Sequence, residues 1–332
     1  MATTEERLAA LEAKLAALTE ITPTTYYEHQ YSGEEIDAAV GRALTGGALD
    51  TSVTNVSNQL GTFTRPNLLD NWYFANPVNQ KGGTEWLSSS NSAIPCVDRW
   101  TWWGQYITGT RLNLLDDGLQ LAKPAEGQGQ GLYQAIIQKI EKTRVPVGAT
   151  VTLSALVKAE ADASVVLAIN ESYNVLSVQA NVWELITFTL NAPSVEQTYS
   201  VSIQRNSGGI AFIVKAVKLE LGPTQTLAHK EGDKWVLNEI PDYGEQLRRC
   251  QWYSLVLPGI YWLPQNADGT NRLTIPIPDM RTIPVVTYEP ADGNTGTLYY
   301  DANLAQKNAI QFYAIGVTGI CGVKNIRISA DL

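Results

Sequence analysis

Tryptophan and tyrosine are the side chains of this sequence whose chemistry is clearest. The chain has nine tryptophans and fifteen tyrosines but only five phenylalanines. Tryptophan and tyrosine combine a flat apolar ring with a polar tip, which suits surfaces that contact a ligand or a partner protein. Because the C–H faces of sugar rings stack on such rings, this composition favours carbohydrate binding.

The densest aromatic cluster is "DRWTWWGQY", residues 98–106. If this segment is a strand, successive side chains lie on opposite faces, so Trp100 and Trp102 share one face and Trp103 lies on the other. One of the two faces must cover the core. We therefore expect Trp100 in the core and Trp103 with Tyr106 exposed to ligand. Burial of the whole cluster in the core or in a protomer interface is an equally open alternative.

Three aromatic residues outside this cluster are further candidates for carbohydrate binding. Trp86 lies upstream of the cluster. The stretch "GIYWLPQNADG", residues 259–269, places Tyr261 and Trp262 beside a turn, where their rings can be exposed.

Recognisable catalytic motifs are missing from the sequence. The two histidines, His29 and His229, lie in different segments, and neither belongs to a pattern typical of nucleophilic catalysis. No phosphate-binding loop, dinucleotide fingerprint or zinc motif is present. Two carboxylates suffice for glycoside hydrolysis, but the fold sets their spacing, and Asp116, Asp117 and Glu171 carry no local signature. We expect a protein that is not an enzyme and needs no cofactor.

The charge and the cysteine content of the chain indicate which classes of partner and which cellular compartment to expect. The formal net charge is −9 and no run of Lys and Arg exceeds two, which disfavours nucleic acid and anionic membrane surfaces as partners. Three widely spaced cysteines argue against a disulfide framework or a zinc site, and for folding in a reducing cytosol. Residues 1–20 lack a secretory pattern, and no apolar run approaches the roughly 18 residues of a membrane span. We therefore expect no membrane insertion, and release by lysis rather than secretion.

Helical periodicity is confined to the N-terminal part of the chain. In "TTEERLAALEAKLAALTE", residues 3–20, Thr3 and Glu6 fit a capping box. Leucines at a and d positions then predict a short coiled coil over residues 1–22 that joins copies of the chain, although packing against the body of the same chain is an alternative. These leucines are Leu8, Leu11, Leu15 and Leu18. Residues 23–64 are expected to form a linker with one short helix.

A two-residue alternation takes over from residue 65 and predicts a mainly β protein. Short alternating segments bounded by Pro, Gly, Asn or Asp indicate a jelly-roll β-sandwich over residues 65–222. The predicted strands cover residues 133–140, 151–159, 164–170, 183–190, 199–204 and 211–221. A connector over residues 223–248, with a short helix after Pro241, leads to a smaller C-terminal β-sandwich over residues 249–332. Its predicted strands cover residues 252–257, 272–278, 283–289, 296–301, 309–317 and 325–330.

The stretch "NLLDNWYF", residues 67–74, is predicted to be the first strand of the larger sandwich. Alternation then places Asp70, Trp72 and Phe74 on one face, with the two aromatic rings in the core. A carboxylate on that face needs a partner, because an unpaired buried charge is very unfavourable.

Several stretches together resemble a known family. "NLLDNWYFANPVNQKG", with the later "CVDRW", resembles the opening of a β-sandwich module of bacteriophage and prophage tail fibre proteins, a module similar to carbohydrate-binding jelly rolls. "VKAVKLELGPTQT", from Val214 to Thr226, is similar to its close. "RTIPVVTYEP" and "IRISADL" resemble the C-terminal sandwich of the same proteins, and "SGEEIDAAVGRAL" resembles a short helix of their N-terminal halves.

The resemblance implies a receptor-binding protein of the virion tail that is not an enzyme. It implies a homotrimer that attaches to tail or baseplate proteins through its N-terminal region and binds host cell-surface glycans. Some related jelly rolls hold a structural calcium ion near the first strand, where Asn67 or Asp70 could supply oxygen ligands. Two alternatives stay open: a tail depolymerase that cleaves surface polysaccharide, and a purely structural fibre segment.

Overall fold

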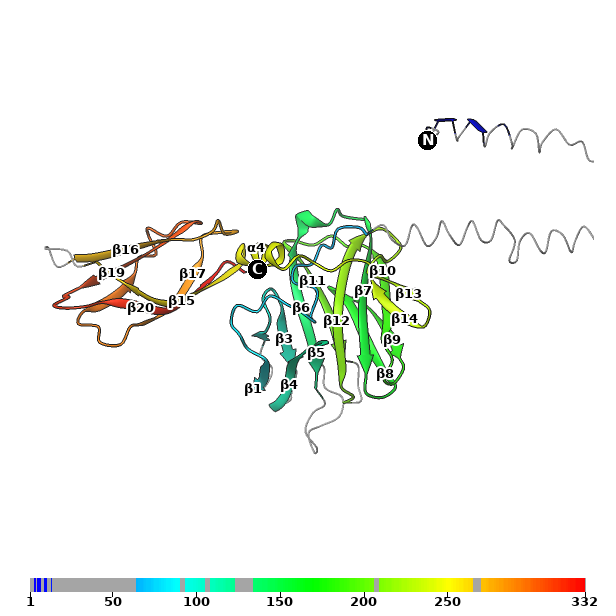
Figure 1. The fold of residues 1–332 in the computed structure, drawn as a ribbon, viewed down its shortest axis with the longest axis horizontal. Helices are drawn as coiled ribbons and strands as arrows, with labels where there is room; N and C mark the ends of the chain where they lie inside the picture. The colour runs from blue at the N-terminus through cyan, green and yellow to red at the C-terminus, as the bar shows by residue number, and fades with distance from the viewer. Residues whose placement is uncertain are drawn as a thin grey trace, which may run out of the picture. The chain divides into compact units, whose positions relative to one another are not determined.

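The computed structural model describes residues 64–89, 93–104, 108–122, 134–205, 209–264 and 270–331, together with positions 3, 5, 6, 9, 10 and 13. The chain divides into two units, residues 1–60 and 61–332, and all the strands described below belong to the second (Figure 1). The coiled-coil leucines Leu8, Leu11, Leu15 and Leu18 lie outside the described residues, as does Tyr106.

The capping box at the N-terminus is confirmed. The backbone N–H of Thr3 donates to Glu6 Oε2 at 2.7 Å, and the N–H of Glu6 donates to Thr3 Oγ1 at 3.3 Å. Each side chain thus satisfies a backbone N–H that the first helical turn leaves without an acceptor.

Two six-stranded antiparallel sheets form the larger β-sandwich, which confirms the predicted mainly β class (Figure 1). The first sheet has the order β1 (Glu85–Ser89), β4 (Thr108–Leu115), β5 (Gly118–Leu121), β12 (Phe212–Leu221), β7 (Thr150–Ala159) and β10 (Glu184–Asn191). The second sheet has the order β2 (Ala93–Pro95), β3 (Thr101–Gly104), β6 (Gln134–Glu141), β11 (Thr198–Arg205), β8 (Ala163–Ile169) and β9 (Ser172–Val178).

One apolar core lies between these two sheets. Alternate residues of β7, such as Leu153, contribute to it from the first sheet, and alternate residues of β11, such as Ile203, contribute from the second. Trp100 is 1% exposed and Trp102 is fully buried, so the prediction that Trp100 belongs to the core is confirmed. Burying rings of this size contributes a large share of the hydrophobic stabilisation.

The prediction that residues 67–74 form the first strand is wrong. Residues 68–71 are bends, Asn71 has a φ of 52°, and Tyr73 makes only an isolated bridge to Ala216. The Asn71 side chain explains the departure, because it closes a loop instead of pointing from a sheet. Its Nδ2 donates to the carbonyls of Val78 and Asp98 at 2.9 and 2.7 Å, and its Oδ1 accepts from the N–H of Val78 at 2.7 Å.

The prediction that Trp72 and Phe74 are buried in the core is nevertheless confirmed. Trp72 is 3% exposed and Phe74 is fully buried, and the Phe74 ring meets Trp100 edge-on at 5.1 Å between centroids. The loop therefore buries its aromatic residues in the core and is held to β12 by backbone hydrogen bonds, although it forms no regular strand.

A hairpin and one helix follow the sandwich. The hairpin pairs β13 (Ala228–Glu231) with β14 (Lys234–Leu237). The predicted helix after Pro241 is confirmed as α4 (Tyr243–Gln251). Asp242 is its N-cap, and the Asp242 carboxylate accepts the N–H of Glu245 at 2.7 Å.

Two three-stranded antiparallel sheets make up the C-terminal part. One has the order β15 (Ser254–Trp262), β20 (Gly322–Ser329) and β17 (Val285–Pro290), and the other has the order β16 (Thr270–Pro276), β19 (Ala309–Ile315) and β18 (Thr297–Tyr300). Both sheets contribute to a smaller core that includes Leu255, Phe312 and Ile326.

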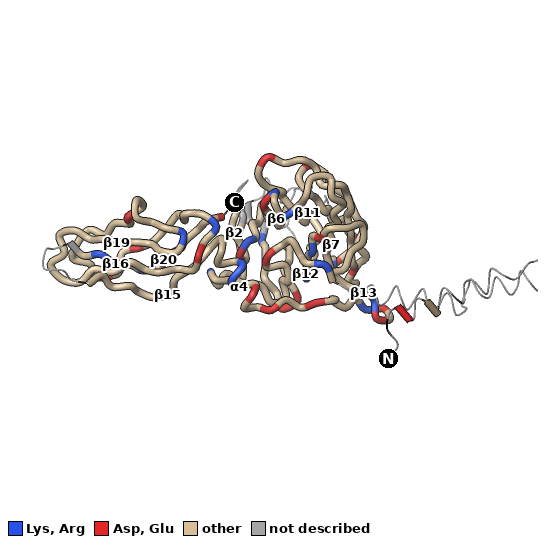
Figure 2. Tube along the Cα trace, turned by 90° about the horizontal axis from the view of Figure 1, so that it is seen from above, with Lys and Arg blue, Asp and Glu red and all other residues tan. Residues whose placement is uncertain are grey.

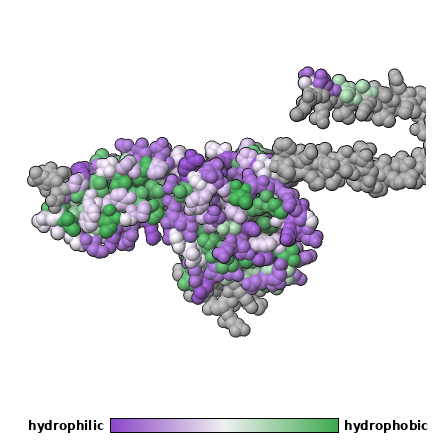
Figure 3. All heavy atoms as spheres, in the orientation of Figure 1, coloured by the Kyte–Doolittle hydropathy of each residue, from purple (hydrophilic) through white to green (hydrophobic). Residues whose placement is uncertain are grey.

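Exposed apolar side chains remain on the surface of the second unit. Green atoms interrupt the hydrophilic surface over both the sandwich and the C-terminal sheets (Figure 3), and Val285, Ile283 and Ile320 are 71%, 58% and 55% exposed. Among the described residues, no helix is both long enough and apolar enough to cross a membrane.

Candidate functional site

The outer face of the second sheet is the surface that carries Trp103. Directly paired residues of neighbouring strands share a face of a sheet, so the strand pairings identify this surface. One row across it consists of Ala93, Trp103, Ala135, Gln204, Val166 and Val175. The next row consists of Pro95, Thr101, Ile137, Ser202, Ala168 and Tyr173. Alternate residues, such as Trp102 and Leu167, point into the core instead.

The outer face has small residues in its middle and aromatic rings towards its two edges. Ala135, Ser202 and Ala168 are the small residues of the central strands. Trp103 on β3 is half-buried, and Tyr173 on the edge strand β9 is 67% exposed. Four strand spacings separate β3 from β9, or about 19 Å at ~4.8 Å per spacing. The central residues Ala135, Ser202 and Ala168 are 2%, 6% and 2% exposed, and the two rings are separated by about the length of a short oligosaccharide.

Polar groups lie on the floor between the two rings. The Gln204 side chain donates from Nε2 to Ser202 Oγ at 2.8 Å. Gln204 Oε1 has no donor among the described residues, so it is available to accept a hydrogen bond. Such a pair can bind a sugar hydroxyl while an aromatic ring contacts the apolar face of the sugar.

A hollow of about 350 Å³ adjoins one end of the outer face. Thr101 and Ile137 of the face line it, together with Asp98 and Asp331. Burial raises the pKa of the Asp98 carboxyl, an effect that hydrogen bonds from Gln80 oppose. The Gln80 backbone N–H and side-chain Nε2 donate to the two Asp98 oxygens, which indicates a structural role for this carboxylate.

The other predicted aromatic residues lie elsewhere. Trp86 belongs to β1 of the first sheet, where it pairs with Leu112 and packs half-buried against the core. Tyr261 and Trp262 belong to β15 of the C-terminal part. Tyr261 packs against the smaller core, whereas Trp262 is 47% exposed. The structure therefore does not bring the candidate aromatic residues together into one site.

Sequence reasoning missed Tyr173 and Gln204. Strand β9 was not predicted, although "NESYNVLSV" carries a recognisable signal. Asn170 and Glu171 form a two-residue connection between β8 and β9, and Asn170 has a φ of 54°. Asn is favoured at such a position of a hairpin turn, so an alternating segment after it indicates the returning strand.

The two residues considered for calcium are bonded to protein groups. Asn67 Oδ1 accepts the N–H groups of Leu69 and Leu219 at 3.0 and 3.1 Å, and Asn67 Nδ2 donates to the Val217 carbonyl at 2.9 Å. These bonds attach the loop to β12. Across the described residues, no group of three or more His, Cys, Asp or Glu side chains is arranged to hold a metal ion.

Asp70 is fully buried among three arginines. Its carboxylate lies 2.9 Å from Arg249 Nε, 3.3 Å from Arg144 Nη1 and 3.4 Å from Arg99 Nε. A cation at this carboxylate would face three guanidinium groups, so the geometry favours an ion-pair role over a calcium site. Because Arg249 belongs to α4 and Arg99 also pairs with Asp331 at 2.6 Å, Asp70 connects the sandwich loop to α4 and the chain's last residues.

Comparison with known proteins shows a distant likeness of fold. No family model and no curated protein matches the chain. A family 4 carbohydrate-binding module is 16% identical, with 37% of this chain and 87% of that chain covered and a TM-score of 0.30. TmCBM61 in complex with β-1,4-galactotriose is 10% identical, with 47% and 99% covered and a TM-score of 0.28. A family 29 carbohydrate-binding module is 12% identical, with 42% and 88% covered and a TM-score of 0.25. No binding residue is transferred from these structures.

Proposed function

We propose that this protein binds a glycan through the outer face of the second sheet and does not cleave it. The observation that carries the proposal is the arrangement of that face, with Trp103 and Tyr173 towards its edges and small and polar residues between them. A sugar ring can stack on each aromatic side chain while Gln204 and Ser202 hydrogen-bond the hydroxyl groups between them.

We also propose a biological setting, on the basis of the sequence resemblance alone. In this setting the protein is a receptor-binding fibre of a phage tail or tail-like particle, made in the host cytoplasm and released by lysis. The leucine-rich segment of residues 1–22 joins three copies, the N-terminal region attaches to tail or baseplate proteins, and the glycan belongs to the host surface. Light scattering of the full chain tests the assembly: a mass three times that of the chain supports it, and a monomer contradicts it.

A glycan array with the full chain tests the binding face. Tyr173→Ala is the informative variant, because this exposed ring contributes little to the core and its loss leaves the fold intact. We expect Tyr173→Ala and Trp103→Ala each to weaken binding of the best glycan at least tenfold. Trp86→Ala, which removes a half-buried tryptophan from the first sheet, is the matched control and should leave binding unchanged.

Two outcomes would contradict this placement. Unchanged binding by both Tyr173→Ala and Trp103→Ala would exclude the outer face as the binding surface. Loss of binding by Trp262→Ala, with the other two variants normal, would assign glycan binding to the C-terminal part instead. A trimer that binds no glycan and no host cell would favour the purely structural fibre segment.

The depolymerase alternative has its own test at Asp98 and Asp331, which line one hollow. If the protein cleaved polysaccharide there, purified host polysaccharide would yield oligosaccharides, and Asp98→Asn and Asp331→Asn would abolish their release. We expect no release by the unaltered protein.

A further inference from the structure

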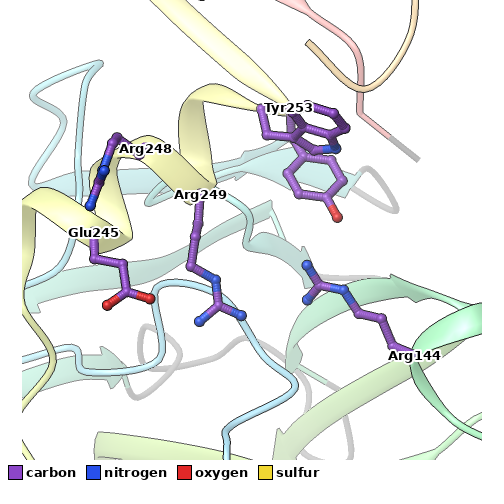
Figure 4. Close-up of a pocket in the computed structure, with 6 residues that line it drawn as sticks. Arg144, Glu245, Arg248, Arg249 and Tyr253 are labelled. Atoms are coloured by element: carbon purple, nitrogen blue, oxygen red, sulfur yellow. The ribbon is translucent and has the colours of Figure 1, made fainter. Parts of the chain in front are cut away.

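A second hollow, of about 380 Å³, lies beside α4. It is lined by Arg144, Glu245, Arg248, Arg249, Trp252 and Tyr253, which we call the α4 pocket (Figure 4). Arg144 ends the 3₁₀ turn Lys142–Arg144 that follows β6, and the other five residues belong to α4 or directly follow it. The segments of Lys and Arg at α4 are visible in Figure 2. None of these residues belongs to the outer face of the second sheet.

The pocket lining contains three guanidinium groups and one carboxylate. Figure 4 shows the guanidinium groups of Arg144 and Arg249 directed towards the same space below the helix. Both are paired with Asp70, which is fully buried, and Arg144 is also paired with Glu141 at 3.4 Å. Arg248 is exposed, and its guanidinium has no hydrogen bond or ion pair to any described residue.

Donors are therefore left over in the pocket. Arg249 uses Nε for Asp70, and its two terminal nitrogens have no acceptor among the described residues. Arginine presents a planar fork of N–H donors that matches the oxygens of a carboxylate or phosphate, and charge-assisted bonds of this kind are about twice as strong as neutral ones. An incoming anion would find such donors from Arg249, and Arg248 lines the pocket beside Glu245 (Figure 4).

Tyr253, which lines the pocket together with Arg144, is held in place by two contacts. The Tyr253 hydroxyl donates to Glu141 Oε1 at 2.7 Å, and Arg99 lies over the Tyr253 ring at 3.4 Å from its centroid. Burial alone would lower the pKa of the Arg144 guanidinium, but the charge of Asp70 and further neighbours outweigh burial and raise that pKa. The cation and its position are thus set before a ligand arrives.

Trp252 adds an apolar ring to this set of cations. Its side chain is 43% exposed at the C-terminal end of α4. A ring of this kind contacts the C–H face of a sugar, while the arginines contact an acidic group on the same unit. Glu245 supplies an acceptor for a hydroxyl on the pocket wall.

We propose that the α4 pocket binds an acidic sugar, that is, a carboxylate or phosphate group carried on a sugar or polyol unit. This site is separate from the outer face of the second sheet and does not depend on glycan binding there. Because the whole chain has a net charge of −9, long-range attraction does not bring a polyanion to the surface, and recognition rests on local contacts with Arg248 and Arg249.

Calorimetric titration of the full chain tests the proposal with three probes: tetragalacturonate, its fully methyl-esterified form and inorganic phosphate. We expect at least one of the two anions to bind and the neutral ester not to bind. Binding of tetragalacturonate alone identifies a carboxylated sugar as the ligand class, and binding of phosphate alone identifies a phosphorylated one. Arg248→Ala should weaken anion binding at least tenfold, and Trp252→Ala should weaken the binding of tetragalacturonate.

Arg327→Ala is the matched control, because Arg327 is also exposed and its guanidinium has no hydrogen bond or ion pair to any described residue. It should leave the dissociation constant unchanged, and so should Trp103→Ala, which tests the other site. The proposal is overturned if neither anion binds at millimolar concentration, if the neutral ester binds equally well, or if Arg248→Ala has no effect. It is likewise overturned if Arg327→Ala or Trp103→Ala weakens anion binding as much as Arg248→Ala does.

Discussion

Replacing Asp70 by asparagine removes the one carboxylate that three arginines share. The Asp70 side chain is fully buried, and its oxygens lie within 2.9 to 3.4 Å of nitrogens of Arg249, Arg144 and Arg99. Asparagine keeps the shape of the side chain but brings no charge, and one of its oxygen positions becomes an N–H₂ group. The guanidinium groups then lose their shared counter-charge, and an amide nitrogen faces N–H donors.

The expected loss of stability follows from this burial. Removing one partner of a buried ion pair costs about 3–5 kcal/mol, because the remaining charge is left uncompensated. For a domain of this size, 1 kcal/mol corresponds to roughly 2–4 °C in melting temperature, so Asp70→Asn should melt roughly 6–20 °C lower. Arg99 and Arg144 keep the carboxylates of Asp331 and Glu141, which places the effect nearer the lower end of the range.

Thermal and urea unfolding of the full chain, followed by tryptophan fluorescence, measure this effect, since Trp100 reports on the adjacent core. Asp117→Asn is the matched control, because it breaks the partly exposed 3.0 Å pair with Lys158 by the same chemical change. The control should cost about 0–1 kcal/mol. Adding Arg249→Met to Asp70→Asn should restore part of the stability, because one uncompensated charge is removed. If Asp70→Asn were no more destabilising than Asp117→Asn, the ion-pair reasoning would be refuted.

Three further predictions follow from individual groups. Gly118→Ala should lower the free energy of unfolding more than Gly148→Ala, as urea unfolding of the two variants will measure. Both glycines have a positive φ, at 150° and 76°, which strains alanine by about 1–3 kcal/mol. Only at Gly118 would the new Cβ also lie 2.3 Å from a backbone oxygen, that of Val214. All three cysteines are buried, and burial raises the pKa of Cys96 to about 12. Ellman's reagent at pH 8 should therefore modify no thiol in the native protein and three thiols after denaturation, whereas rapid modification of the native protein would contradict the burial. Burial by itself would raise the pKa of Glu141, but the hydrogen bond from Tyr253 and the charge of Arg144 outweigh burial and lower that pKa. The resulting stabilisation is present above the ordinary pKa of a glutamate and is lost as pH falls through the pKa of the folded state. The unfolding free energy should therefore fall more steeply from pH 5 to pH 3 in the unaltered protein than in Glu141→Gln, and equal slopes would contradict the shift.

The sequence predicted several of the strands, among them two that are mostly buried on both faces. Strand β7 was predicted at residues 151–159 and covers Thr150–Ala159, and β12 was predicted at 211–221 and covers Phe212–Leu221. Both carry long runs of β-branched and apolar residues. Strand β9 was missed because most of its side chains are exposed at the edge of the sheet, so no apolar period marks it. The signal that identifies β9 lies in its turn and not in the strand itself.

The loop of residues 67–74 shows a different limit of pattern reading. Its apolar residues alternate like those of a strand, and the expectation that Trp72 and Phe74 are buried was right. Asn71 nevertheless takes a positive φ, because its side chain bonds to Val78 and Asp98, a residue 27 positions away. A partner at that distance in the sequence leaves no local trace. The same applies to Asp70, whose three arginines come from three separate segments of the chain.

The two proposed binding sites differ in charge: the outer face binds an uncharged ligand, whereas the α4 pocket binds an anion. The two rows that define the outer face contain no charged residue, so an uncharged glycan loses little solvation there beyond its hydroxyl groups. The α4 pocket instead concentrates guanidinium groups in a chain whose net charge of −9 repels a polyanion at long range. Increasing salt weakens the attraction inside the pocket but also screens the general repulsion. Anion binding at Arg248 should therefore depend less on salt than binding to a basic surface does, whereas binding at Trp103 and Tyr173 should not depend on salt at all.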